Sequence, residues 1–168
     1  MPAIARSWGF NSPLQHSTSP LYTETHRRQH SFMADCIFCK IIAKQVPKRI
    51  LWENDHFLAF LDLTPVQPGH LLIIPKEHIE TVFDMPDGLY EELFNAAKAL
   101  STPLQKAMKS VRVGMVIEGF GVPHTHLHLV PINKSHDLDS GNARPASPEE
   151  LDAIADKIEK QIADRKIK

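Results

Sequence analysis

The stretch His124-Thr125-His126-Leu127-His128 carries a histidine at every second position. Successive side chains of a β-strand point to opposite faces, so this alternation predicts a strand with three imidazoles on one face and a core-facing side opposite. Burying unpaired polar rings is costly, and a core strand has no structural use for a row of them. The row predicts a functional site. The plainer alternative is a solvent-facing strand that happens to carry histidine.

Length and composition predict one soluble domain. The 168 residues suit a single core, and 19 Lys and Arg against 20 Asp and Glu leave no basic surface for nucleic acid. No stretch approaches the roughly 18 apolar residues of a transmembrane helix, so no membrane partner is expected. Two cysteines make no disulfide framework and nothing resembles a secretory signal, which favours a reducing, cytoplasmic location.

Residues 1–33 differ from the rest of the chain. They are rich in Ser, Thr, Pro, His and Arg, contain one acidic residue, Glu24, and show no apolar periodicity. This composition predicts a disordered leader, and its scarcity of acids also fits organellar import. The alternative is a start site assigned too early, because Met33 lies just before the first patterned block. The folded domain is expected over residues 34–168.

Apolar periodicity predicts the elements of that domain. We expect a short helix over 36–45, a central helix over 87–109 that Pro103 kinks or splits, and a C-terminal helix over 148–166 opened by a capping box. Five strands are expected over 49–53, 56–62, 70–74, 112–118 and 124–130. Strands grouped before and after a central helix indicate an α+β fold with a mainly antiparallel sheet.

The candidate residues allow more than one chemistry. Neutral imidazole is a competent nucleophile for nucleotidyl transfer, whereas His-x-His pairs also bind metals. Asp62 follows an apolar run, where its carboxylate can accept ribose hydroxyls or cap the Thr-Pro turn that follows. The pair Cys36-x-x-Cys39 is half of a zinc site, a redox pair, or two reduced thiols.

Four blocks in order resemble the histidine triad (HIT) family of nucleotide hydrolases and transferases. They span residues 36–42, 58–65, 69–78 and 121–131. The resemblance covers about residues 35–134, and the Cys-x-x-Cys block is similar to the Hint-like branch that has a zinc motif. It implies the HIT-like fold, a five-stranded sheet with a central and a C-terminal helix, and a homodimer.

The resemblance also implies residue roles. In the triad of His124, His126 and His128, the middle ring attacks the α-phosphate of a purine nucleotide and is nucleotidylated, while His128 donates a hydrogen bond to a phosphate oxygen. Asp62 holds the ribose. The base lies in an apolar slot of Phe38, Ile41, Phe60 and Leu63. Considered one at a time, each of these residues fits an ordinary place in the hydrophobic core nearly as well. Structural zinc, not required for chemistry, would be bound by Cys36, Cys39, His78 and His124.

The loop before the triad departs from the family pattern. Many members carry an asparagine on the preceding strand and a polar pair such as Gln-Ser; here Ile117 stands at the asparagine position and residues 117–123 hold neither Gln nor Ser. Backbone N–H groups around Gly119 and Gly121 are candidate substitutes in nucleotide binding, since glycine permits close approach. The leaving group is therefore the part that the sequence does not specify.

These observations predict a nucleotide hydrolase acting through a nucleotidylated histidine. It would cleave nucleoside 5′-phosphoramidates, or related adenylated compounds, to the nucleoside monophosphate. A dinucleoside polyphosphate hydrolase with the same nucleophile is one alternative. A weakly active nucleotide-binding interaction module, left by the loss of the polar loop, is the other.

Overall fold

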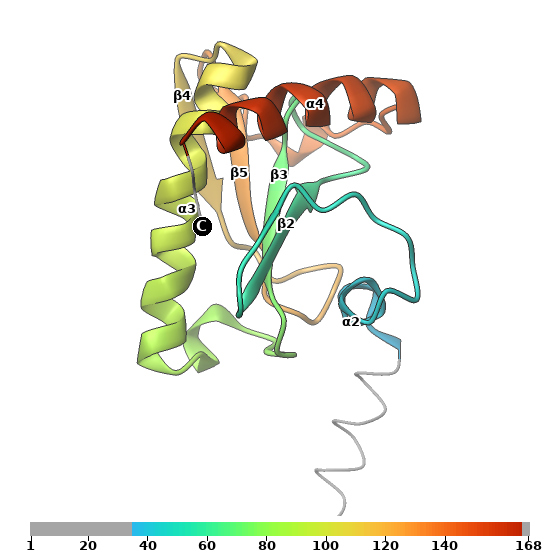
Figure 1. Ribbon diagram of the computed structural model, residues 1–168, viewed down its shortest axis with the longest axis vertical. Coiled ribbons are helices and arrows are strands. Elements are labelled where there is room, and N and C mark those ends of the chain that lie inside the picture. The colour runs from blue at the N-terminus through green and yellow to red at the C-terminus, as the bar shows by residue number, and fades with distance from the viewer. Residues whose placement is uncertain (1–34, 166–168) are drawn as a thin grey trace, which may run out of the picture. The chain divides into compact units, whose positions relative to one another are not determined.

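The computed structural model describes residues 35–165. The leader predicted over residues 1–33 lies outside them and stays a prediction. Within the described range, no helix has both the length and the apolar character needed to cross a membrane. The elements follow one another as shown in Figure 1: α2 Ile37–Ile42, β1 Trp52–Glu53, β2 Phe57–Leu61, β3 Leu71–Pro75, the 3-10 helix η1 Val82–Asp84, α3 Asp87–Met108, β4 Arg112–Val116, β5 Leu127–Ile132, the 3-10 helix η2 Ser140–Asn142, and α4 Pro148–Arg165.

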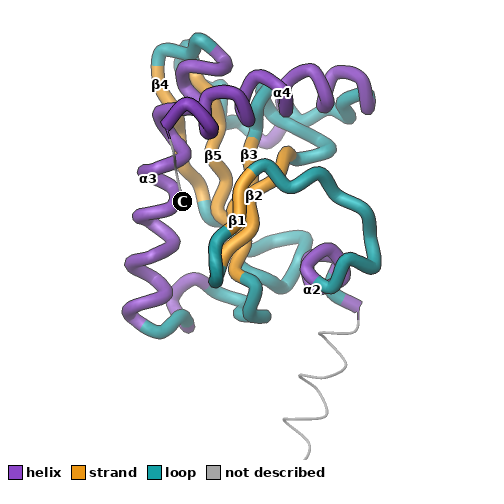
Figure 2. Tube along the Cα trace, in the orientation of Figure 1, coloured by secondary structure: helices purple, strands orange, loops and turns teal. Residues whose placement is uncertain are grey.

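The strands form one five-stranded sheet in the order β1-β2-β3-β5-β4 (Figure 2). All four pairings are antiparallel, so the predicted α+β class and sheet are confirmed. The central strands β2 and β3 are buried at every position. Antiparallel strands usually leave one face in water, so burial on both sides means that both faces of this sheet are covered.

Helices α3 and α4 cover one face. The apolar stripe of α3 includes Leu93, Leu100 and Leu104 at helical spacing, and it shares a core with Ile73 and Leu127 of the sheet. The helix runs through Pro103 instead of splitting there. Helix α4 packs across one end of α3 (Figure 1) and, as the capping box predicts, its first turn is closed by a backbone N–H bond to a serine hydroxyl.

Helix α2 covers part of the opposite face. It is shorter than the predicted 36–45, beginning after Cys36 at the N-cap and ending at Ile42. Phe38 and Ile41, three residues apart on one side of the helix, pack against Phe60 and Leu72 in a second, smaller core. The sheet thus separates two cores, and the smaller one lies on the face that carries His128, the cross-strand partner of Leu72.

The triad strand begins later than predicted. β5 starts at Leu127, not at residue 124, so only His128 of the three histidines lies in the strand. The register that pairs Ile73 with Leu127 would bring Pro75 opposite Thr125, and proline has no N–H to continue the ladder. The preceding segment is instead held by the Thr125 N–H, which donates to the Ile79 carbonyl at 2.6 Å.

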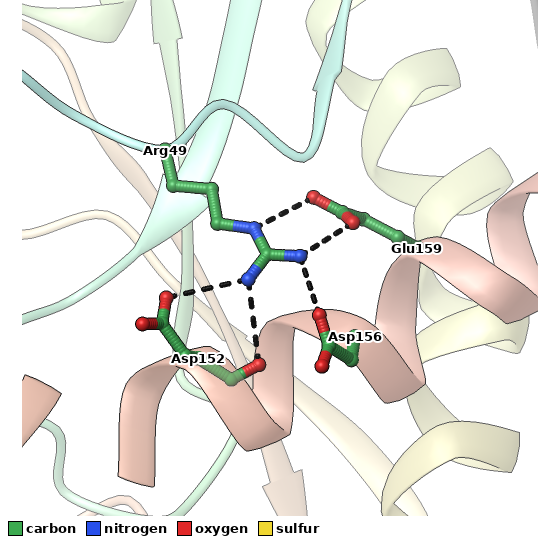
Figure 3. Close-up of polar contacts among 4 residues, drawn as sticks. All are labelled: Arg49, Asp152, Asp156 and Glu159. Atoms are coloured by element: carbon green, nitrogen blue, oxygen red, sulfur yellow. Dashed lines mark hydrogen bonds and ion pairs between the residues drawn. The ribbon is translucent and has the colours of Figure 1, made fainter. Parts of the chain in front are cut away.

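Arg49 ties the loop before β1 to α4 (Figure 3). Its Nε and Nη2 donate to the two carboxylate oxygens of Glu159 at 3.0 and 2.7 Å, and Nη2 also reaches Asp156 at 2.6 Å. Nη1 donates to Asp152 at 3.3 Å. The hydrogen bonds to Glu159 raise the pKa of the guanidinium further above its usual range. Isolated surface pairs contribute little, but this bidentate network fixes the path of the loop.

Gly69 is required by the turn that leads into β3. Its φ is +86°, and a Cβ there would lie 2.7 Å from Met108 Cγ and 3.1 Å from Pro131 Cγ. We expect Gly69→Ala to lower the free energy of unfolding by about 1–2 kcal/mol, since side chains are strained at positive φ. The control is Gly88→Ala in α3, where a Cβ meets nothing within 4 Å. Urea denaturation giving equal stabilities for the two variants would contradict this.

Candidate functional site

Four side chains from three separate segments meet beside α2. The ligand atoms of Cys36, Cys39, His78 and His124 all lie within 4.8 Å of one another. His124 Nδ1 is 3.5 Å from the Cys36 sulfur and 3.6 Å from the Cys39 sulfur, which is 3.2 Å from His78 Nδ1. In a tetrahedral zinc site, sulfur and nitrogen ligands are about 3.6 Å apart, from bond lengths of about 2.3 and 2.0–2.1 Å. The donor set and its spacing therefore fit a tetrahedral metal ion.

The Cys39 thiol is poorly suited to a redox role. Both cysteines are free, and burial together with the neighbouring Cys36 raises the pKa of Cys39 to about 12. Reactive redox cysteines need the thiolate, which this environment suppresses in the metal-free protein. His78 turns its Nδ1 towards the cluster, whereas its Nε2 is buried without a hydrogen-bond partner among the described residues.

A main-chain carbonyl sets the tautomer of His124. The ring is fully buried, and its Nε2 is 2.9 Å from the Pro75 carbonyl oxygen, which only accepts. The proton therefore resides on Nε2, and the lone pair on Nδ1 faces the two sulfurs. Burial lowers the pKa of His124 to about 4, with the neighbouring His78 and His126 adding to the effect against the opposing Pro75 bond.

His126 is oriented by the residue two positions before it. Its Nδ1 lies 2.7 Å from the carbonyl oxygen of His124, so Nδ1 carries the proton. In this tautomer the lone pair is on Nε2, and the side chain lines a cavity that His128 also lines. Phe38 packs on this ring with centroids 5.3 Å apart. The arrangement presents a positioned nucleophilic nitrogen.

A hydrogen-bond chain from the backbone orients His128. The Val66 N–H donates to His70 Nδ1 at 3.3 Å, so neutral His70 carries its proton on Nε2. That Nε2 is 2.7 Å from His128 Nδ1. His128 Nδ1 therefore accepts, and its Nε2–H is the donor. The same atoms with Asp62 form a second group within metal-ligand distance, but the direct bond between the two rings indicates a relay.

Burial keeps the rings of this relay neutral. It lowers the pKa of His128 to about 4, assisted by His70 and His126 and opposed by Asp62. Burial also lowers the pKa of His70, with Asp62 again opposing it. A neutral His128 at pH 7 can donate one hydrogen bond from Nε2 to an anionic oxygen.

The cavity beside these rings has a volume of about 300 Å³. The predicted slot residues and Asp62 all line it together with His126 and His128, whereas Gly119 and Gly121 do not; their neighbour Val122 does. Asp62 Oδ1 accepts the Thr64 N–H at 2.8 Å, so the aspartate also caps the turn, while Oδ2 lies 3.7 Å from His70 Nδ1. The predicted slot is thus a continuous apolar cleft with a carboxylate on its wall.

Besides apolar lining residues, sequence reasoning missed two ionisable residues of this site. His70 had a usable signal, since it follows Gly69 at the head of a strand within a quoted block. Lys48 had none. It is half-buried, lines the cavity, and places its ammonium 5.1 Å from the Phe60 ring centroid. Burial lowers the pKa of Lys48, and the Asp62 carboxylate opposes that shift.

A family model of the HIT domain matches residues 43–135, more than half of the chain. The chain belongs to the HIT family. One relative is the adenosine 5′-monophosphoramidase of Schizosaccharomyces pombe, which is 34% identical over 131 residues, 76% of this chain and 98% of the relative. With the Cys-x-x-Cys cluster, this likeness confirms the predicted Hint-like branch of the HIT family.

Solved HIT structures have the same fold. A histidine triad nucleotide-binding protein from Sulfolobus tokodaii superposes with a TM-score of 0.69 at 26% identity, covering 78% of this chain and 94% of that one. A zinc-bound histidine triad family protein from Mycobacterium smegmatis superposes with a TM-score of 0.68 at 24% identity, covering 80% and 97%. The second likeness concerns the fold alone.

The His128 environment is testable by titration. We expect nitrogen NMR of the folded protein to give His128 a midpoint near pH 4 and an Nε2–H tautomer at pH 7. Because the pKa of His128 is lower in the folded protein than the unfolded value of 6.5, the unfolded chain binds the proton first as pH falls. The contribution of His128 to the free energy of unfolding is therefore highest above pH 6.5 and decreases as the pH falls towards 4. The urea-unfolded chain is the control. A folded midpoint near 6.5, or an Nδ1–H tautomer, would refute the relay.

Proposed function

We propose that this HIT protein hydrolyses nucleoside 5′-phosphoramidates, or related adenylated compounds, to the nucleoside monophosphate. The observation that carries the proposal is the hydrogen bond from His126 Nδ1 to the His124 carbonyl, which leaves Nε2 as a free nucleophile on the cavity wall. The monophosphoramidase name of the S. pombe relative supports this substrate class.

The first step transfers the nucleotide to the enzyme. The Nε2 lone pair of His126 bonds to the α-phosphorus while the phosphorus–nitrogen bond of the substrate breaks. The electron pair of that bond leaves on the amine, which takes up a proton. The His128 Nε2–H donates to a non-bridging phosphate oxygen, where negative charge builds up.

The second step restores the enzyme. Water attacks the same phosphorus, the bond to Nε2 breaks, and its electron pair returns to the His126 ring. The nucleoside monophosphate leaves with the oxygen of water, and a proton is released. Throughout both steps, Asp62 accepts the ribose hydroxyls through its free lone pairs, and Phe38 and Phe60 flank the base.

Two alternatives share the nucleotide site. A dinucleoside polyphosphate hydrolase would use the same nucleophile on a phosphoanhydride. A weakly active binding module is favoured by one observation, the lack of Gln or Ser in residues 117–123, which leaves no such side chain there to protonate a leaving group. Measuring the turnover of adenosine 5′-phosphoramidate and of a diadenosine polyphosphate discriminates between the three functions. Each hydrolase should prefer its own substrate, and the binding module should turn over both poorly.

His126→Ala should reduce turnover by about a thousandfold or more while changing the affinity for the monophosphate much less, because the nucleophile acts in the transition state. Mass spectrometry after rapid quenching should find the nucleotide on His126 of the wild type. The exposed His56→Ala serves as the control and should behave as wild type. An adduct on His124 or His128, or full activity in His126→Ala, would reject the assignment.

We further propose that the Cys36, Cys39, His78 and His124 cluster holds a structural zinc ion. Four protein ligands leave no open position for substrate, so zinc would fix the triad segment and take no part in bond making. Binding of both sulfurs as thiolates would also replace the close contact between the buried Cys36 thiol and the half-buried Cys39 thiol.

Chelation should lower the melting temperature by roughly 5–10 °C, the shift expected when a ligand that binds only the folded state is removed. Cys39→Ser should lower it similarly and abolish the chelator effect, whereas His56→Asn should retain about one zinc per chain. Elemental analysis without zinc in protein purified free of chelators would exclude the site. Zinc-reversible loss of all activity in the folded protein would favour metal-dependent hydrolysis.

We also propose a homodimer formed along β4. β4 is an edge strand of the sheet, its Met115 is 47% exposed, and Val111, the residue before the strand, is 64% exposed. An uncovered apolar edge is prone to pair with another strand. Analytical ultracentrifugation at micromolar concentration should find a dimer that Met115→Arg converts to monomer, while Phe83→Arg, at an exposed position in η1, does not. A monomeric wild type would refute this.

A further inference from the structure

Among the described residues, Lys48 is the one lysine or arginine that lines the cavity beside His126 and His128, and the proposed mechanism does not use it. Its side chain is half-buried, and its ammonium lies 5.1 Å from the centroid of the Phe60 ring. It forms no salt bridge with the carboxylates of residues 35–165. Its three N–H donors are therefore available to a bound ligand.

The strand register shows how far Phe60, the ring next to the Lys48 ammonium, lies from the triad. Phe60 pairs with Leu72 on β3, and Leu72 pairs with His128 on β5, so these side chains form one row on one face. Two strand spacings separate Phe60 from His128, about 10 Å in all. That span suits a nucleotide with its phosphate at the histidines and its base over Phe60. The base would then meet the Lys48 ammonium.

The loop that carries Lys48 is held in place independently of the ligand. The next residue, Arg49, is bonded to Asp152, Asp156 and Glu159 of α4 (Figure 3). The backbone at Lys48 is thus fixed, while the four-carbon side chain can move from the face of the ring to the edge of a stacked base. Lys48 is positioned to hydrogen-bond the base without a change of fold.

We propose that Lys48 selects 6-oxopurine nucleotides over adenine nucleotides. We take the edge of the base that faces Lys48 to be its major-groove edge. On this edge guanine presents two acceptors, O6 and N7, whereas adenine presents N7 beside the N6 amino donor. An ammonium only donates, so it pairs with both acceptors of a 6-oxopurine and opposes the amino group of adenine. This proposal rests on the proposed function, because it requires the nucleotide to bind with its phosphate at the triad.

The experiment compares kcat/KM for adenosine, inosine and guanosine 5′-phosphoramidates. Wild type should favour inosine and guanosine by about tenfold, the scale of one charge-assisted hydrogen bond in a half-buried site. Lys48→Met should bring the three substrates within about twofold. Lys48→Gln, which donates and accepts, should shift the preference towards adenosine. Lys98→Met removes the same charge from an exposed position on α3 and should keep the wild-type ratios.

Each comparison uses the ratio of kcat/KM values for two substrates of the same variant. An effect of the substitution on the phosphoramidate group, which all substrates share, therefore cancels. No preference in wild type, or a preference that survives in both Lys48 variants, overturns the role of Lys48. Inosine behaving like adenosine would do the same, because it would mean that the 2-amino group of guanine is recognised. If no substrate is turned over, the proposed function fails. The calorimetric Kd values of AMP, IMP and GMP then test Lys48 separately, with the same order expected.

Discussion

His124 joins the two parts of this site, and the geometry of both depends on its burial. Its Nδ1 faces the two thiols, its Nε2–H is bonded to the Pro75 carbonyl, and its own carbonyl accepts from His126. His124 thus supplies a nitrogen ligand to the four-residue cluster, and its carbonyl orients the ring of the proposed nucleophile. The fold supports it by ending β3 at Pro75, directly opposite the approach to β5.

The sheet separates two cores that have different roles. The larger core under α3 and α4 contains most of the buried apolar residues, and residues of the smaller core under α2 line the cavity. Thr125, Leu127 and Leu129 point into the buried side between the histidines, so the alternation in the sequence serves both purposes. The larger core also meets the site outside the strands, because Ile79 packs against it and accepts the Thr125 N–H.

Much of this could be predicted from the sequence, because the patterns that carry it are local. The period-two row, the helical stripe of α3 and the capping box of α4 each report on a few neighbouring residues. The beginning of β5 could not be predicted, because it depends on which residue of β3 lies opposite. The same holds for Lys48 and His70, whose positions over Phe60 and against His128 are set by the register of strands distant in sequence.

The groups that orient the three triad rings are main-chain atoms, with the His70 ring as an intermediary for His128. The Pro75 carbonyl, the His124 carbonyl and the Val66 N–H set the three tautomers, directly or through His70. Apart from His70 these groups are main-chain atoms, so a systematic mutational scan would detect the rings but not the carbonyls and the N–H that orient them. Diverging relatives could exchange most neighbouring side chains and keep the same protonation pattern, provided that the backbone path is preserved.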